Sequence, residues 1–198
     1  MAKSLDEIRS DARRCQDCPL WANATQTVFG AGDPHARVML VGEQPGDEED
    51  RKGLPFVGPA GRLLDRALEA AGVEREQLYV TNAVKHFKFQ LRGKRRIHKT
   101  PAQREIEACH QWFEREVAAV RPRVIVCLGA TAARAVIGKD FKVSVMRGKF
   151  VDSPYAPAVF ATFHPSALLR LQDEEEKERA FKQLVKDLKL VNKGLAGP

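Results

Sequence analysis

The sequence contains no apolar run long enough to cross a membrane. Its hydrophobic stretches have the length of a strand, as Val124–Leu128 does, whereas a membrane helix needs ~20 residues. The N-terminal residues also lack the apolar core of a signal peptide. Since 43% of the 198 residues are hydrophobic, the chain is too apolar to remain disordered. It is predicted to fold as one cytoplasmic domain over residues 1–198, with no membrane partner.

Three common nucleotide-binding and catalytic motifs are also absent. The sequence has no G-x-x-x-x-G-K-[ST] loop, no G-x-G-x-x-G turn and no G-x-S-x-G nucleophile elbow. These absences argue against hydrolysis of nucleoside triphosphates, dinucleotide redox chemistry and serine hydrolysis.

Acidic residues are missing from one long segment, residues 77–104. This segment carries eight lysines and arginines, more than the net charge of +7 of the whole chain, so the remainder is close to neutral. The eight are Lys85, Lys88, Arg92, Lys94, Arg95, Arg96, Lys99 and Arg104. A positive charge confined to one segment indicates binding to a polyanion. The alternative is a solvated loop without a partner.

Strand patterns and helix patterns alternate along the chain. The predicted strands are residues 37–41, 78–82, 123–128 and 158–162, and the predicted helices are residues 4–14, 62–71, 100–120, 131–137 and 174–191. Residues 83–99 are predicted to form a long loop, and residues 194–198 a tail. This alternation predicts an α/β fold, a three-layer α/β/α sandwich with a central, mainly parallel, four-stranded sheet.

Polar and glycine residues follow all four predicted strands. They are the segment from Gly42 to Gly46, Asn82, Gly129 and His164. Ligands of open parallel sheets bind beyond the carboxyl ends of the strands. The four strand ends are therefore predicted to meet in one crevice.

Four side chains near this crevice have chemistry that suits a ligand. Glu43 is a candidate general base or stabiliser of positive charge, and Phe56 a stacking surface for a planar ligand. Asn82 can pair with the edge of a base, and His164 can donate a proton to an anion. Each also has a plain structural interpretation: a carboxylate at a helix start, a core aromatic, a turn asparagine and a structural histidine.

The four cysteines are Cys15, Cys18, Cys109 and Cys127. A cytosolic protein rarely uses cysteines in disulfides, and the C-x-x-C spacing of the first two is typical of metal ligands. The spacing alone does not separate zinc from an iron–sulfur cluster. The alternative is that Cys109 and Cys127 are simply buried, since free cysteine is common in apolar strands.

Five motifs together resemble the family 4 uracil-DNA glycosylases. They occur in the family's order over about residues 15–190: CQDCPL (15–20), GEQPGDEED (42–50), PFVGPAG (55–61), TNAVK (81–85) and HPSALLR (164–170). Two departures resemble the UdgX subgroup, whose members bind uracil-containing DNA covalently. The family usually has alanine where Gln44 stands, and a short Lys-Cys-Arg-Pro-Pro segment where residues 85–99 form a longer basic insertion containing KRRIH (94–98).

The resemblance implies a substrate, a cofactor and roles for the residues of the crevice. The partner would be uracil-containing DNA, and the cofactor a four-iron, four-sulfur cluster of structural role on the four cysteines. Separately from the resemblance, we expect single-stranded DNA to be favoured and the protein to be a monomer. Phe56 would stack on the uracil, Asn82 would pair with its edge, and Gly42 and Gln44 would lie against the base. His164 would donate towards the leaving uracil while Glu43 stabilises the sugar cation.

The same resemblance makes His98 a nucleophile. A neutral imidazole near C1′ would compete with water through its high effective concentration and leave the protein attached to DNA after a single turnover. Phosphates would be held by Lys94, Arg95, Arg96, Lys99 and Ser166. Two alternatives stay open. One is a conventional multiple-turnover glycosylase that leaves an abasic site, with His98 on a phosphate. The other is a noncatalytic single-strand-binding module.

Overall fold

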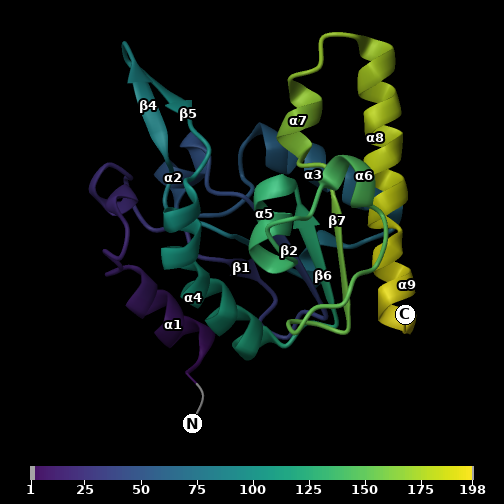
Figure 1. Cartoon of the computed structure of the whole chain (residues 1–198), viewed down its shortest axis with the longest axis horizontal. Coiled ribbons are helices and arrows are strands. Elements are labelled where there is room, and N and C mark those ends of the chain that lie inside the picture. The colour runs from purple at the N-terminus through teal and green to yellow at the C-terminus, as the bar shows by residue number, and fades with distance from the viewer. Residues whose placement is uncertain (1–2, 198) are drawn as a thin grey trace.

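The computed structural model describes residues 3–197 as a three-layer α/β/α sandwich (Figure 1). The central sheet contains β1 (Ala31–Gly32), β2 (Val38–Gly42), β3 (Leu78–Asn82), β6 (Val124–Leu128) and β7 (Ala158–Thr162), in the order β1-β3-β2-β6-β7. The last four strands are the predicted ones and are mutually parallel. The predicted number of four is wrong, because the two-residue β1 adds an antiparallel edge beside β3. Two residues are too few to show an alternating pattern.

The four parallel strands are buried along their whole length. Their side chains alternate between two apolar clusters, so Val38 and Leu40 point to one face of the sheet and Met39 and Val41 to the other. Strands covered on both faces are mostly apolar, and this is why they are visible in the sequence as nearly continuous apolar runs.

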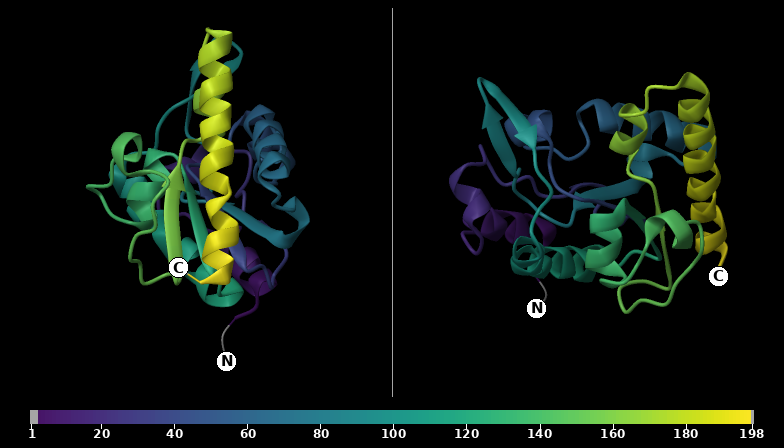
Figure 2. Two further views of the ribbon diagram at one scale, coloured as in Figure 1. Left: turned by 90° about the vertical axis from the view of Figure 1, so that its right-hand side faces the viewer. Right: turned by 45° about the horizontal axis from the view of Figure 1, so that its top comes forward.

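Helices cover both faces of the sheet (Figure 2). One face packs against α3 (Pro59–Ala71), α7 (Pro165–Leu169), α8 (Glu174–Leu188) and α9 (Leu190–Ala196). The other packs against α4 (Gln103–Val120), α5 (Ala130–Val136) and α6 (Val143–Met146), and α1 (Leu5–Ala12) lies outside α4. The predicted sandwich is confirmed. No helix within residues 3–197 is long and apolar enough to span a membrane.

Several helix boundaries differ from the prediction. The N-cap of α4 is Ala102 rather than Thr100, because the Glu105 carboxylate accepts the backbone N–H of Ala102 at 2.6 Å. The last predicted helix divides at Lys189, and α9 occupies most of the predicted tail. Short elements were not predicted at all: α2 (Asp47–Lys52), α6, α7 and the 3₁₀ turns Pro19–Ala22 and Arg75–Gln77.

The prediction of a long loop over residues 83–99 is wrong in part. This segment contains an antiparallel hairpin of β4 (Phe89–Arg92) and β5 (Arg95–His98), with the left-handed Gly93 in its turn. In Figure 1 the hairpin rises beside α2 and faces α7 and α8 across an open space. The inner face of β5 carries Arg96, whose guanidinium lies over Phe89 at 5.1 Å. A strand whose inward residue is arginine shows no apolar alternation, which is why it looked like a loop.

Candidate active site

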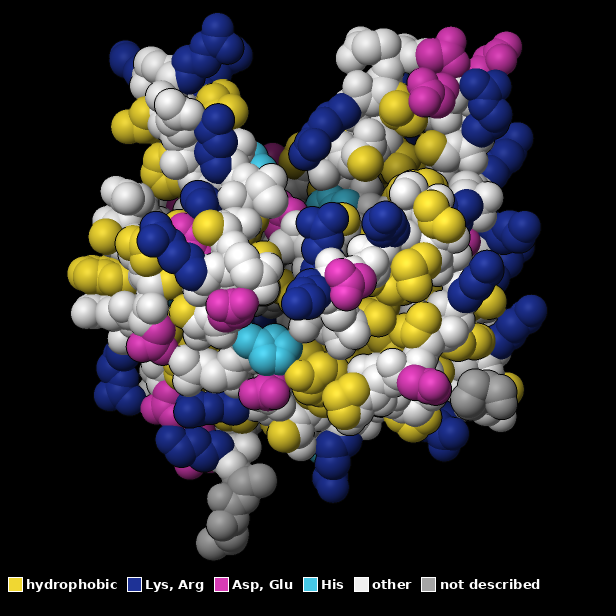
Figure 3. Space-filling model, viewed as in Figure 1, with side chains coloured by type: hydrophobic (Ala, Val, Ile, Leu, Met, Phe, Trp, Pro, Cys, Tyr) yellow, Lys and Arg dark blue, Asp and Glu magenta, His cyan; other side chains and the backbone are white. Residues whose placement is uncertain are grey.

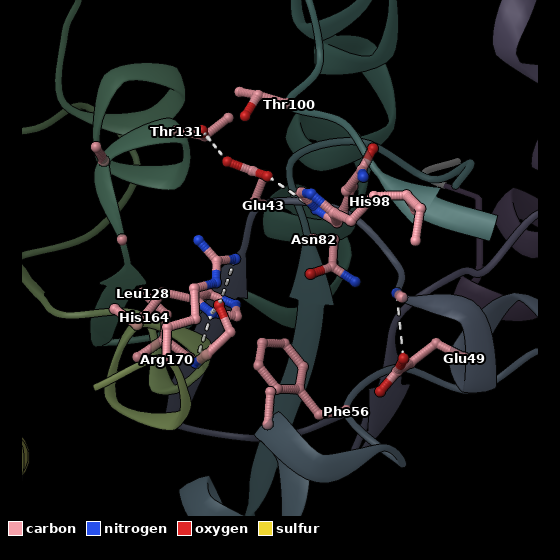
Figure 4. Close-up of a pocket in the computed structure, with 18 residues that line it drawn as sticks. Glu43, Glu49, Phe56, Asn82, His98, Thr100, Leu128, Thr131, His164 and Arg170 are labelled. Carbon is pink, nitrogen blue, oxygen red and sulfur yellow. Dashed lines mark hydrogen bonds and ion pairs between the residues drawn. The ribbon is translucent and has the colours of Figure 1, made fainter. Parts of the chain in front are cut away.

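A cavity of about 620 Å³ lies at the carboxyl ends of the parallel strands, between the hairpin and α7. Figure 3 shows this hollow as a notch between two arms of the molecule, and Figure 4 shows its lining. Seven predicted site residues line it: Glu43, Gln44, Phe56, Asn82, His98, His164 and Ser166. The crevice predicted from the parallel topology therefore exists.

The floor of the cavity is built around Asn82. Its side chain is almost fully buried, and its Oδ1 atom has no hydrogen-bond partner among residues 3–197. A buried acceptor without a donor costs about 1–3 kcal/mol, so this atom is suited to receive an N–H from a ligand. Gly42 makes room for it, because a Cβ there would lie 2.3 Å from Oδ1.

Phe56 forms the apolar side of the floor. It has a left-handed backbone with φ of 55°, which is costly for a bulky side chain. Its ring lies 5.8 Å from the His164 ring, centroid to centroid. Strained residues of this kind collect at ligand sites, and here the strain places an aromatic ring beside a polar edge. The floor thus suits a flat heterocycle with an N–H donor.

Glu43 lies on the cavity wall between two hydrogen-bonding partners. Its Oε1 atom lies 3.2 Å from Nε2 of His98, and its Oε2 atom accepts a hydrogen bond from the Thr131 hydroxyl (Figure 4). Burial raises the pKa of Glu43, but the bonds from His98 and Thr131 outweigh it and lower the pKa below its usual value. The carboxylate is therefore ionised at neutral pH.

His164 is held as a neutral donor. Burial lowers its pKa to about 4, so the imidazole stays uncharged above that pH. Its Nδ1 atom accepts the backbone N–H of Ser166 at 3.1 Å, which leaves the single ring proton on Nε2. A neutral Nε2–H inside a buried site can stabilise an anion without a desolvated charge of its own.

Gln44 lines the cavity, and its amide also holds the hairpin in place. Its amide nitrogen donates to the carbonyl oxygens of Lys88 (3.2 Å) and Lys99 (3.1 Å), and its Oε1 accepts the Lys88 N–H at 3.0 Å. Lys88 and Lys99 flank the two hairpin strands. Gln44 therefore ties both ends of the hairpin to the sheet, and its contact with a base stays a prediction.

Arg96 is a second attachment of the hairpin. Its Nη1 lies 2.6 Å from Oδ2 of the buried Asp50, its Nε contacts Asp47, and its side chain is only 13% exposed. The charge predicted to hold a phosphate is thus already paired with two carboxylates. Because His98 is two residues along the same strand, Gln44 and Arg96 together fix the place of the imidazole.

The remaining predicted DNA contacts lie at the rim. Lys94, Arg95 and Lys99 are exposed on and beside the hairpin, and Ser166 is half-buried on the opposite wall. Figure 3 shows lysine and arginine side chains on both arms of the notch. Sequence reasoning missed Thr131 and Arg170, which also line the cavity. Thr131 could have been found, because it lies two residues after Gly129, which directly follows a predicted strand.

The four predicted metal ligands do not come together. Three of them lie near one another, because Cys15 and Cys18 pack against the apolar cluster that contains Cys109. Burial raises the pKa of the Cys109 thiol to about 12, and the neighbouring Cys18 and Cys15 add to this rise. Sγ of Cys109 accepts the Lys85 backbone N–H at 3.2 Å. Cys127 is separate: it is fully buried within β6, and burial alone raises its pKa. Within residues 3–197, no three His, Cys, Asp or Glu side chains form a metal site. The four-cysteine set does not fit a cluster.

Comparisons with known proteins identify one superfamily. The profile of the uracil DNA glycosylase superfamily matches residues 29–189. A type-4 uracil-DNA glycosylase of Thermotoga maritima is 36% identical over 193 residues, which cover 96% of this chain and 97% of the relative. One of Archaeoglobus fulgidus is 36% identical over 92% of each chain. A type-5 uracil-DNA glycosylase of Pyrobaculum aerophilum is 31% identical over 83% of this chain and 76% of its own.

Proposed function

The chain belongs to the uracil DNA glycosylase superfamily, and from this premise we propose that it excises uracil from DNA and remains bonded through His98 to C1′ of the deoxyribose. The observation that carries the covalent part is the 3.2 Å contact between His98 Nε2 and Glu43 Oε1 on the wall of the cavity. A histidine used only to grip phosphate would sit at the rim with Lys94 and Arg95.

Recognition of the base rests on the cavity floor. A uracil turned out of the stack, or taken from a single strand, would lie against Phe56 and offer its N3–H to the unpartnered Oδ1 of Asn82. The Nδ2 amide of Asn82 would donate to O4. Cytosine carries no N3–H, so the same carbonyl would reject it.

Cleavage of the N1–C1′ bond separates charge. The uracil departs as an N1 anion, and the Nε2–H of His164 is directed to its O2 atom, a contribution of a few kcal/mol for a preorganised donor. The sugar becomes cation-like, and the ionised Glu43 carboxylate on the wall stabilises it. Neither step needs a metal ion or an electron.

Capture by His98 balances without an outside reagent. As the Nε2 lone pair forms a bond to C1′, the Nε2 proton passes to Glu43. Glu43 then gives up this same proton, which neutralises the uracil anion, and the carboxylate is ionised again. The products are neutral uracil and an imidazole alkylated on Nε2. An imidazole held on a fixed strand competes with water through an effective concentration that can reach about 10⁵ M.

A denaturing gel tests this proposal. The protein is mixed with a single-stranded oligonucleotide containing one uracil, with its duplex form, and with a thymine control. A heat- and detergent-stable shifted band with uracil alone is the expected result. DNA that breaks at the uracil position after alkali, without a shifted band, would establish conventional turnover. If neither a shifted band nor breakage is seen, the protein has no glycosylase activity, and a binding module is favoured.

Arg96 and Arg95 form a matched pair for the role of the hairpin. Arg96→Ala is expected to slow adduct formation at least tenfold at saturating DNA, because it frees the strand that carries His98. Arg95→Ala, which removes an exposed charge, is expected to weaken DNA binding and reduce its salt slope by about 1. If Arg96→Ala crosslinks normally but has a reduced salt slope, Arg96 contacts a phosphate, as the sequence predicts.

Iron content tests the cysteines separately. If the purified protein carries iron, Cys127→Ala is expected to retain it, while Cys109→Ala is expected to lose most of it, because Cys127 lies apart from the other three. The iron content of His86→Ala is measured in the same way, because His86 is a buried residue next to Lys85 in the sequence, with its Nε2 atom 2.9 Å from Thr27 Oγ1. Loss of iron from Cys127→Ala, in a variant that melts normally, would restore the four-cysteine set.

A further inference from the structure

We propose that Thr131 is a positioning residue that completes a Thr131–Glu43–His98 relay and decides how excision is divided between covalent capture and release. The inference rests on the proposed function and adds a residue to it. It is based on the observation that the two carboxylate oxygens of Glu43 have different partners, Thr131 on α5 and His98 on the hairpin.

The two partners of Glu43 differ in exposure. His98 is 38% exposed at the end of the two-stranded hairpin. Thr131 is buried in the first turn of α5, where the next two residues, Ala132 and Ala133, are fully buried against the sheet. The carboxylate is thus anchored on its α5 side by a buried residue, and its other partner, the imidazole, is the more exposed of the two.

The direction of the hydrogen bond follows from chemistry. An ionised carboxylate only accepts, so the Thr131 hydroxyl must donate its proton to Oε2. This leaves Oε1 as the oxygen that faces His98. Without the hydroxyl, the carboxylate can rotate about its terminal torsion, which is broad and weakly restrained, and His98 loses a fixed partner.

The hydroxyl also serves the ionisation of Glu43. Hydrogen bonds to a carboxylate favour its charged form, and the bond from Thr131 is one of the causes that lower the pKa of Glu43. Excision depends on the charge of this carboxylate, whereas capture also depends on its alignment with His98. Loss of Thr131 is therefore expected to affect capture more strongly than excision.

Two substitutions separate the hydroxyl from the volume of the side chain. Thr131→Val keeps the shape and removes the donor, and Thr131→Ser keeps the donor. In single-turnover assays with uracil-containing DNA, Thr131→Val is expected to slow uracil release about tenfold and to leave most of the excised DNA as free abasic product. Thr131→Ser is expected to partition as the unaltered protein does.

The pH profile supplies a readout that a merely structural residue would not move. The excision rate falls as Glu43 is protonated, so a higher pKa in Thr131→Val moves the acid limb of the profile to higher pH. An unchanged partition and acid limb in Thr131→Val, or a Thr131→Ser variant that behaves like it, would overturn the relay. If the unaltered protein forms no adduct, the covalent proposal fails, but the acid limb still tests the bond between Thr131 and Glu43.

Discussion

Replacing His98 with alanine is expected to abolish the covalent protein–DNA band while uracil is still released. Phe56, Asn82, His164 and Glu43 all remain in the cavity, so the base is still bound and its departure still stabilised. Water then fills the space of the imidazole and attacks C1′, giving an abasic site. The variant is expected to turn over repeatedly, whereas the unaltered protein stops after one equivalent.

The measurement is the amplitude of uracil release with DNA in tenfold excess. One uracil per protein is expected for the unaltered chain, and several for His98→Ala. His35→Ala is the matched control, because His35 is exposed near the amino ends of the strands, away from the cavity. An unchanged shifted band in His98→Ala would show that another group forms the bond. Loss of both band and release would make His98 part of excision itself.

The sheet was predictable because its physics is local in sequence. A parallel strand buried on both faces is mostly apolar, and β2, β3, β6 and β7 are buried along their length, with polar residues only near the carboxyl ends of β3 and β7. The hairpin was not predictable by the same reasoning. Its inner residue, Arg96, is satisfied by Asp47 and Asp50, which are nearly fifty residues away, so nothing in the segment itself indicates a strand.

The site divides in the same way. Parallel topology was enough to predict that the segments after the strands meet, and this brought Glu43, Asn82 and His164 together. Side-chain partners were beyond that argument. That Gln44 also holds the hairpin could not be seen in the sequence, and Cys127 was counted as a ligand because counting cysteines cannot show on which side of a sheet each one lies.

Lys85 shows how far charge counting can mislead. It was counted with the cations of the basic segment, yet its side chain is 1% exposed and its Nζ lies 2.6 Å from Oε2 of the fully buried Glu116. The same Nζ donates to the Thr81 hydroxyl and to the Asn82 carbonyl, each at 2.7 Å. Lys85 is therefore an internal brace beneath the floor of the cavity and contributes no surface charge.

Lys85→Met is expected to destabilise the protein by about 3–5 kcal/mol, because it leaves the Glu116 carboxylate buried without its counter-charge. Adding Glu116→Gln removes that charge, and the double variant is expected to regain most of the loss. Denaturant unfolding measures both. Lys52→Met breaks the exposed pair with Glu48 and serves as the control, with an expected cost of at most about 1 kcal/mol. A single variant as stable as this control would contradict the role of the pair.

The double variant also tests whether the brace serves base recognition. Lys85 holds the backbone of Asn82, whose side chain carries the unpartnered acceptor of the cavity floor. Without the brace, Asn82 keeps its chemistry but loses its fixed position, so binding of uracil-containing DNA should weaken while the reacting groups on the wall stay in place. The expected result is a KM for excision raised about tenfold with kcat nearly unchanged, measured on the folded double variant with the covalent step removed by His98→Ala. An unchanged KM would confine the pair to stability.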